Sequence, residues 1–428
     1  MKYLGIDLGG TNVAAAVVDS EGTILGKVSL PTPRGAEAVA DQMAAAARGA
    51  AEAAGTALDE VVSVGIGAPG AIEPDTGVIK YWSNLDFTNV PITALMKARL
   101  DKEILLENDA NAAALGEYAA GAGKGSQSMV AVTLGTGDKA IVIGGQNVLP
   151  FYTFDASIEN APKIGIEISD CASEWNVPGL KEFYAGCTTM ADYAKRAETM
   201  PGADFLCLHF ESADPNGANR SVADCVADAK AVAEVVSMPI VVMGCKNIEK
   251  DGELFSKIAE ALQGKNILVL SARNEDYKTV GASVALAYGQ KVGAETADDI
   301  NLAKQLNIML KGLTVAPTSI VMNVGTAAVG YGYEYVASTL DRVRLAALAQ
   351  SDADLQMPIM APVSPDTWAV KESTASEDDE PAWGSQEDRG VGMEVATAAA
   401  NLTGGADAVI MRHPAAVATI KQFITELV

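Results

Sequence analysis

The feature that most constrains the fold is a run of eight short apolar segments, each followed by a helical pattern. The segments are Ile164–Ile168, Phe205–Phe210, Ile240–Met243, Ile267–Leu270, Val292–Glu295, Ile320–Asn323, Ile359–Val363 and Ala408–Met411. Their starts are separated by 25 to 49 residues, which is close to the roughly 30 or more residues of a βαβ unit. The intervals carry apolar residues at helical spacing, as at Ile258, Ala261 and Leu262. The pattern predicts an α/β chain that ends in a (β/α)8 TIM barrel, with Ala140–Ile143 and Leu149–Phe154 as a lead-in hairpin.

Ahead of the barrel, an apolar strand ends in a carboxylate and glycines, in the order Asp7, Leu8, Gly9, Gly10, Thr11. Glycines let backbone N–H groups approach a phosphate, and Asp7 could order a magnesium ion through water. The alternative to a phosphate-binding loop is that these residues form an ordinary tight hairpin. A second such loop, Gly135-Thr136-Gly137, follows the apolar segment Val130–Leu134.

Asp109 lies where a predicted strand passes into the helix Ala110–Tyr118. One interpretation is a helix N-cap, a position that Asn and Asp fill well. The other is a general base at a strand end that takes a proton from a hydroxyl group.

Polar residues follow the barrel strands, and catalytic residues of such barrels lie at the carboxyl ends of the strands. The candidates on this face are Ser212, Asp214, Asn216, Asn219, Asn274, Asn301 and Asn323. Turn formation explains Asp214 and Asn216 equally well, and Asn301 could cap a helix. The set holds no strong acid–base pair, which favours hydrogen bonding to a ligand over proton transfer.

Composition excludes several classes of protein. The net charge of −24 repels nucleic acid and anionic membranes. No stretch approaches the roughly 18 apolar residues of a membrane span. The five cysteines form no CxxC motif, so we expect neither a zinc site nor an iron–sulfur cluster in this chain, and reduced thiols in the cytoplasm.

The first part of the chain resembles the ROK family of bacterial sugar kinases, close to its glucokinases. The matching stretches are Gly5–Thr11, Gly65–Gly70, Ser83–Phe87, Glu107–Tyr118 and Thr133–Gly137. The resemblance implies a ribonuclease-H-like lobe of the actin/hexokinase type, with Gly9, Gly10 and Thr11 on the phosphates of ATP. It also implies Asn84, Asn108 and Asp109 at the sugar, with Asp109 as the base. The resemblance stops near Gly137, so we expect the second kinase lobe, with its adenosine pocket and zinc site, to be missing.

The remainder resembles the small subunit of the corrinoid iron–sulfur protein, also called the delta subunit of acetyl-CoA decarbonylase/synthase. The matching stretches are Glu211–Val222, Met243–Asp251, Asp299–Leu310, Val329–Leu345, Trp383–Gly390 and Met411–Val417. The resemblance implies a barrel related to pterin-dependent methyltransferases, in a heterodimer whose large subunit holds the iron–sulfur cluster. It implies a cobalamin shared between the two subunits and covered by the carboxyl-end face. A pterin methyltransferase and the acetyl-CoA synthase would be further partners.

The sequence therefore predicts two domains, a truncated kinase lobe over residues 1–137 and a corrinoid-protein barrel over 138–428. The favoured function is that of a corrinoid-associated subunit in methyl transfer for acetyl-CoA synthesis or decarbonylation. One alternative is an ATP-dependent sugar kinase that uses ATP and magnesium. The other is an artificial or recombined chimera with neither activity.

Overall fold

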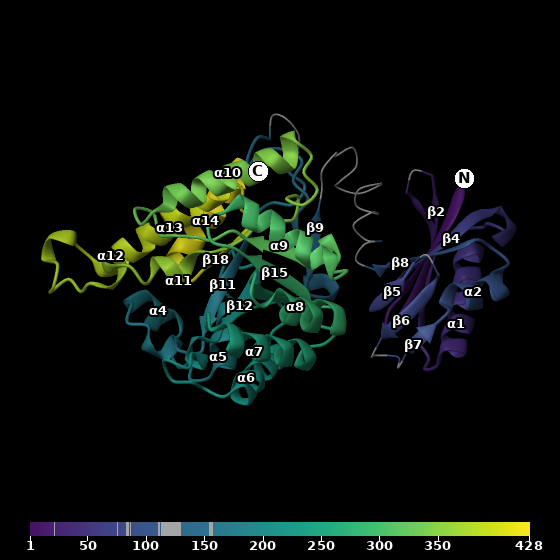
Figure 1. The fold of residues 1–428 in the computed structure, drawn as a ribbon, viewed down its shortest axis with the longest axis horizontal. Helices are drawn as coiled ribbons and strands as arrows, with labels where there is room; N and C mark the ends of the chain where they lie inside the picture. Colours follow the sequence, from purple (N-terminus) through teal and green to yellow (C-terminus); the bar gives the residue numbers. More distant parts are fainter. Residues whose placement is uncertain are drawn as a thin grey trace. The chain divides into compact units, whose positions relative to one another are not determined.

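The computed structural model describes residues 1–20, 22–74, 76–82, 85, 87–109, 112, 130–153 and 157–428. The chain forms two compact units, Met1–Ser126 and Gln127–Val428, which are described separately (Figure 1). In the described part of the chain, no helix combines the length and apolar character that crossing a bilayer requires.

Unit 1 contains a five-stranded sheet in the order β3-β2-β1-β4-β8. Its strands are β1 (Lys2–Leu8), β2 (Asn12–Asp19), β3 (Ile24–Pro31), β4 (Val61–Ala68) and β8 (Ile104–Asn108). The first three strands pair antiparallel, whereas β4 and β8 extend the sheet in parallel from β1. This arrangement confirms the predicted ribonuclease-H-like lobe.

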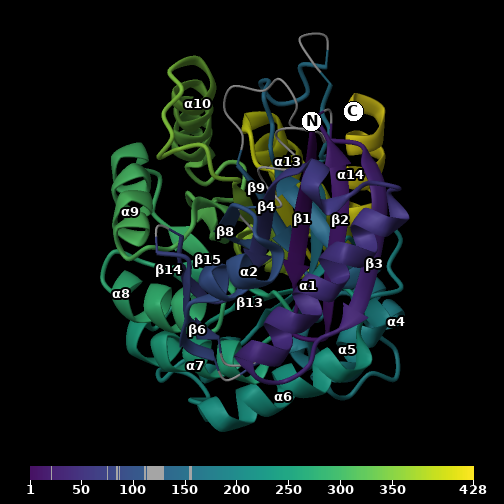
Figure 2. The same ribbon diagram turned by 90° about the vertical axis from the view of Figure 1, so that its right-hand side faces the viewer.

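Among the described residues of unit 1, two α-helices and a small sheet accompany the large sheet. They are α1 (Ala36–Ala53), α2 (Ile92–Leu100), β5 (Ala71–Glu73), β6 (Val78–Trp82) and β7 (Phe87–Val90). Figure 2 shows α1 along one face of the large sheet. The helix approaches closely because its buried face is mostly alanine and because Gly26 of β3 has no side chain. A Cβ on Gly26 would lie 2.4 Å from the backbone nitrogen of Ala54.

Unit 2 is a barrel of eight parallel strands with helices around it (Figure 1). The strands are β11 (Lys163–Ser169), β12 (Phe205–His209), β13 (Ile240–Met243), β14 (Leu268–Ala272), β15 (Lys291–Glu295), β16 (Ile320–Asn323), β17 (Met360–Pro362) and β18 (Ala408–Met411). Neighbouring strands pair in parallel around the ring, and a bridge between Met322 and Ile359 closes the barrel between β16 and β17. The TIM barrel predicted from the sequence is confirmed.

Helices follow every barrel strand. They are α4 (Pro178–Phe183), α5 (Met190–Ala197), α6 (Val222–Val235), α7 (Ile248–Ala261), α8 (Tyr277–Val280), α9 (Ile300–Gly312), α10 (Tyr333–Ala349), α11 (Val363–Thr367), α12 (Lys371–Thr374), α13 (Gln386–Gly404) and α14 (Pro414–Leu427). The turn Gly281–Ala287 continues α8 with wider π-helical spacing. The largest apolar cluster lies between these helices and the outward side chains of the strands.

A hairpin of β9 (Ala131–Leu134) and β10 (Ile141–Gly144) closes the amino end of the barrel. Its side chains Val132, Leu134 and Ile143 share an apolar cluster with inward-facing barrel residues such as Phe205 and Leu268. The backbone N–H of Gly135 donates to the carbonyl of Asn266, just before β14, at 3.0 Å. The stretch Leu134–Asp138 therefore contains the end of β9 and the first part of the turn of this hairpin.

This hairpin differs from the prediction. We expected β10 to pair with Leu149–Phe154, but it pairs with β9, and residues 149–153 form no strand. Phe154 lies outside the described residues. The division by contacts falls between Ser126 and Gln127, ahead of the boundary expected near Gly137. The assignment of functional domains to 1–137 and 138–428 stays a prediction.

Candidate functional site

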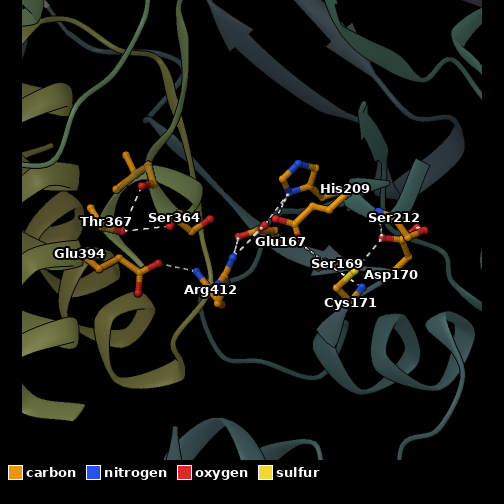
Figure 3. Close-up of polar contacts among 12 residues, drawn as sticks. Glu167, Ser169, Asp170, Cys171, His209, Ser212, Ser364, Thr367, Glu394 and Arg412 are labelled. Atoms are coloured by element: carbon orange, nitrogen blue, oxygen red, sulfur yellow. Dashed lines mark hydrogen bonds and ion pairs between the residues drawn. The ribbon is translucent and has the colours of Figure 1, made fainter. Parts of the chain in front are cut away.

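Glu167 is the central charged residue at the carboxyl end of the barrel. It lies in β11 and is fully buried, at 0% exposure. Arg412 follows β18 and binds the Glu167 carboxylate through Nε at 3.1 Å and a terminal nitrogen at 2.9 Å. His209 at the end of β12 places its Nδ1 2.8 Å from the same carboxylate (Figure 3). Because β12 and β18 are the two neighbours of β11, pairing of the strands brings these three side chains together.

The three charges in this network depend on one another. Burial alone would raise the pKa of Glu167, but the Arg412 charge and the His209 hydrogen bond outweigh it and lower the pKa to about 2. Burial would lower the pKa of His209, but its contacts with Glu167 raise the pKa above the ordinary value. The indole of Trp175 covers the Arg412 guanidinium at 4.6 Å. Glu167 therefore stays ionised between the Arg412 guanidinium and the His209 ring.

Glu394 of α13 fixes the loop that carries Arg412. Its carboxylate accepts the backbone N–H of Arg412 at 2.5 Å and that of His413 at 3.1 Å. The next side chain, His413, stacks on Trp368 and contacts Glu387 through Nε2 at 2.9 Å. Burial raises the pKa of Glu394 from 4.5 to about 7. The loop is thus held by a carboxyl group that is partly protonated at neutral pH.

This raised pKa predicts that the barrel becomes less stable as the pH rises. A carboxyl group that binds its proton more tightly in the folded state contributes full stability below pH 4.5 and loses it as pH rises through about 7. A shift of this size corresponds to at most about 3 kcal/mol. Glu394→Gln should flatten the pH dependence of urea unfolding between pH 5 and 8. Glu260→Gln, at an exposed position of α7, is the matched control. An unchanged pH dependence in Glu394→Gln would contradict the assignment.

A second polar cluster lies beside the first, after β11 and β12. Ser169 donates a hydrogen bond to Glu211, and Ser212 donates one to Asp170 through its hydroxyl group. The backbone N–H of Ser212 adds a bond of 3.1 Å to Asp170. Ser212, predicted to face a corrinoid, is therefore engaged within the protein.

Glu167, His209 and Glu211 have ligand atoms within 4.8 Å of one another, a spacing compatible with a metal ion. Arg412 and His209 already neutralise the Glu167 carboxylate. The ion pairs account for this cluster without a metal.

A cavity of about 470 Å³ opens among the carboxyl ends of β13 to β17. Its lining is Met243, Gly244, Lys246, Asp251, Leu270, Arg273, Asn274, Glu275, Glu295, Thr296, Ala297, Leu302, Asn323, Gly325, Thr326, Pro362, Pro365 and Asp366. Arg273 pairs with Glu295 at 3.1 Å, and burial raises the pKa of Asp366. The Thr296 hydroxyl is buried and finds no hydrogen-bond partner among the described residues.

Lys246 enters this cavity from a loop in an uncommon conformation. Its φ is +67°, in the left-handed region that disfavours residues with a side chain. Asp251 holds the loop by accepting the Cys245 N–H at 2.8 Å, and Gly244 leaves room for that carboxylate. Arg273 also donates to the Lys246 carbonyl at 3.3 Å. Such maintained strain is typical of functional loops.

Only some of the polar residues that were candidates on the carboxyl-end face lie together in the structure. Asn274 and Asn323 line the cavity. The side chains of Asp214 and Asn216 bond to each other in an exposed turn, and Asn219 accepts a hydrogen bond from Lys250 at 3.1 Å. Asn301 lies at the start of α9, where its backbone N–H donates to the capping Asp299. These last four positions are absent from the cavity lining.

Sequence reasoning missed Glu167 and His209. The available signal was a lone glutamate in the otherwise apolar segment Ile164–Ile168, followed by a histidine at the end of the next strand. A charge inside a buried strand requires a partner, so the pattern could have predicted the ion pairs.

In unit 1, Asp7 at the end of β1 and Asp109 just after β8 lie at the carboxyl ends of parallel strands. Burial and the nearby Asp109 raise the pKa of Asp7. The Gly9 N–H donates to the Asn12 carbonyl at 3.0 Å, so Gly9, Gly10 and Thr11 form the tight turn between β1 and β2. Asn108 ends β8.

Other predicted kinase positions lie elsewhere. Asn84 falls outside the described residues. Gly135, Thr136 and Gly137 lie in unit 2, in the turn of the β9–β10 hairpin.

Comparison with known proteins also divides the chain into a kinase-like first part and a barrel that follows it. Residues 131–420 match the family described as CO dehydrogenase/acetyl-CoA synthase delta subunit, and residues 3–149 match the ROK family. The two matches overlap over the β9–β10 hairpin. Both resemblances predicted from the sequence are confirmed.

Individual relatives agree with these matches. The chain is 33% identical over 299 residues to the acetyl-CoA decarbonylase/synthase complex subunit delta of Archaeoglobus fulgidus, covering 68% of this chain and 65% of the relative. It is 35% identical over 218 residues to the glucokinase of Streptomyces coelicolor, covering 50% of this chain and 66% of the relative. The chain thus spans slightly less than two thirds of each of these relatives.

Among solved structures, a dihydropteroate synthase of Xanthomonas albilineans with 4-aminobenzoic acid is similar at a TM-score of 0.44 and 14% identity, covering 70% of this chain and 98% of that one. The delta subunit match extends over more than half of the sequence and contains the whole eight-stranded barrel. The chain belongs to the CO dehydrogenase/acetyl-CoA synthase delta subunit family, and a ROK-like region precedes the barrel of that family.

Proposed function

We propose that the barrel is a corrinoid-associated subunit that takes part in methyl transfer within an acetyl-CoA decarbonylase/synthase complex. The observation that carries this proposal is the cavity of about 470 Å³ at the carboxyl end of a delta-subunit barrel. Relatives of this chain are named as subunits of such a complex. The cofactor would be a cobalamin, whose cobalt carries the methyl group.

The chemistry of the cavity fits the amide-rich periphery of a corrinoid. The Thr296 hydroxyl lacks a partner, and Asn323 lies within the lining. Hydroxyl and amide groups can donate to or accept from peripheral acetamides. Lys246 adds a cation held in place by its loop. We assign the contacts with the corrinoid to these three side chains.

The size of the cavity supports a shared cofactor. A corrinoid macrocycle with its nucleotide arm is much larger than 470 Å³, so this cavity could enclose only part of it. We therefore propose a heterodimer in which a large corrinoid iron–sulfur subunit encloses the remainder. A pterin methyltransferase and an acetyl-CoA synthase would exchange the methyl group with the pair.

Titration with methylcobalamin, followed by absorbance, tests this function. We expect weak binding to the chain alone and tight binding once a purified large corrinoid iron–sulfur subunit is added. Thr296→Val should weaken the joint binding by roughly fivefold, because it removes one hydrogen bond worth about 1 kcal/mol. The hydroxyl is unpartnered, so this variant should fold normally.

The matched control is Thr403→Val, whose hydroxyl bonds to its own helix and is exposed. Equal affinity of wild type and Thr296→Val for methylcobalamin would show that the cavity is not part of the corrinoid site. Failure of the large subunit to raise the affinity would contradict the proposed function itself.

The position of Asp7 beside Asp109 favours a second candidate, a sugar kinase that uses ATP and magnesium. In that function Asp109 would act as the base, and Asn84 and Asn108 would contact the sugar. A recombined chain with neither activity is the remaining alternative.

A further inference from the structure

The segment between α11 and α13 forms an arm, residues Lys371–Ser385, on unit 2. Figure 1 shows α12, which begins the arm, at the outer end of the unit and away from the barrel strands. Arg389 of α13 holds the arm, donating to the carbonyls of Glu372 at 2.8 Å, Ala375 and Gly384. Gln386 adds bonds to the carbonyls of Ser373 and Thr374. The backbone of the arm is therefore fixed by side chains from the helix behind it.

This fixed arm presents an aromatic side chain to solvent. Trp383 is 38% exposed, although tryptophan is a residue that folded proteins usually bury well. Lys371 lies 4.9 Å from its ring centroid, and the Arg389 guanidinium lies 5.7 Å from it. These cations hold the indole in place. An aromatic side chain that is already ordered loses little conformational entropy on binding, which is the condition that favours an interface anchor.

The surroundings of Trp383 carry a net negative charge. Glu377, Asp378 and Asp379 are exposed on the arm. The nearby cations are already engaged, since Lys371 pairs with Glu380 at 2.6 Å and Arg389 is bonded to backbone carbonyls. A second copy of the chain would bring a like-charged arm against this one and would be repelled. The surface therefore suits a basic partner.

We propose that the arm docks a separate protein whose surface has an apolar pocket for Trp383 bordered by lysine or arginine. This inference rests on the proposed function, because it identifies that protein with the large corrinoid iron–sulfur subunit. Trp383 supplies the apolar anchor, and Asp378 and Asp379 steer the approach.

Binding of the full chain to a purified large subunit, measured by surface plasmon resonance, tests the proposal. Trp383→Ala should weaken the affinity by roughly 30-fold, the loss typical of an interface anchor, mainly through faster dissociation. Trp383→Phe should recover most of that loss. The double variant Asp378→Asn/Asp379→Asn should slow association by a few-fold and reduce its dependence on salt.

Tyr81→Ala, at an exposed tyrosine of unit 1, is the matched control and should bind as wild type does. Unchanged melting temperatures would show that every variant is folded. Wild-type affinity in Trp383→Ala would overturn the docking proposal and leave the proposed function standing. Absence of binding by the wild type would overturn the proposed function, and the docking proposal with it. Self-association that disappears in Trp383→Ala would assign the arm to a second copy and overturn the proposal as stated.

Discussion

Glu167→Ala should lower the free energy of unfolding of the barrel by about 3 to 5 kcal/mol, the range for removing one partner of a buried ion pair. The carboxylate lies at 0% exposure, neutralises Arg412 and contacts the His209 ring. Without it, the Arg412 guanidinium would stay charged in a dry site, because arginine does not lose its proton. Urea unfolding followed by circular dichroism should show a lower transition midpoint for the barrel.

Two further variants sharpen this prediction. Glu167→Gln keeps an acceptor oxygen but removes the charge. Its free energy of unfolding should therefore lie between those of the wild type and Glu167→Ala. Glu174→Ala removes an exposed carboxylate from the loop after the same strand and should change stability by less than about 0.5 kcal/mol. A midpoint for Glu167→Ala equal to that of Glu174→Ala would mean that water replaces the lost partner.

The barrel could be predicted from the sequence because burial on both faces makes parallel strands read as apolar runs. The bounds of Ile240–Met243, Ile320–Asn323 and Ala408–Met411 agree with β13, β16 and β18. The remaining strands differ at their ends by a few residues, where hydrogen bonding rather than hydrophobicity sets the limit. A repeat of eight such units leaves few alternative folds.

The β9–β10 hairpin could not be assigned from local pattern. The apolar pattern fits strands of a kinase lobe and a hairpin that closes a barrel equally well. Both structures would bury the side chains of Val132, Leu134 and Ile143. Gly135 and Gly137 suit either interpretation, because the hairpin turn also needs positive φ values, here +77° and +64°. Long-range contacts distinguish the two, namely the bond of Gly135 to Asn266 and the packing of the hairpin on Phe205 and Leu268, and local pattern does not contain them.

The placement of polar residues at the carboxyl-end face could be predicted from strand polarity, but the direction of each side chain could not. Asn219 and Asn323 both follow barrel strands, yet Asn219 accepts a hydrogen bond from Lys250, whereas Asn323 lines the cavity. Asn219 has a positive φ of +49° and lies in the loop between β12 and α6. Loop geometry, which tertiary contacts decide, therefore determines which strand-end residues share a site.

Sugar phosphorylation should be at least about 10⁴-fold slower than in a complete two-lobed kinase, since positioning alone can contribute 10⁵ or more in effective concentration. Asp7 and Asp109 lie together in unit 1, where, in the kinase alternative, they would supply a magnesium-ordering carboxylate and the base. The predicted second phosphate loop, Gly135–Gly137, is instead the turn of the hairpin that closes the barrel. Its backbone N–H at Gly135 already bonds to Asn266 and is not available to a phosphate.

A coupled assay with ATP and glucose measures this turnover, and Asp109→Ala is the required comparison. Equal background rates in wild type and Asp109→Ala would agree with the prediction. Turnover in the wild type that disappears in Asp109→Ala would contradict it and make the kinase the leading function. Because phosphoryl transfer depends mainly on positioning and charge stabilisation, a lobe with the base but without a clamp on the nucleotide should bind ligands weakly and turn them over very slowly.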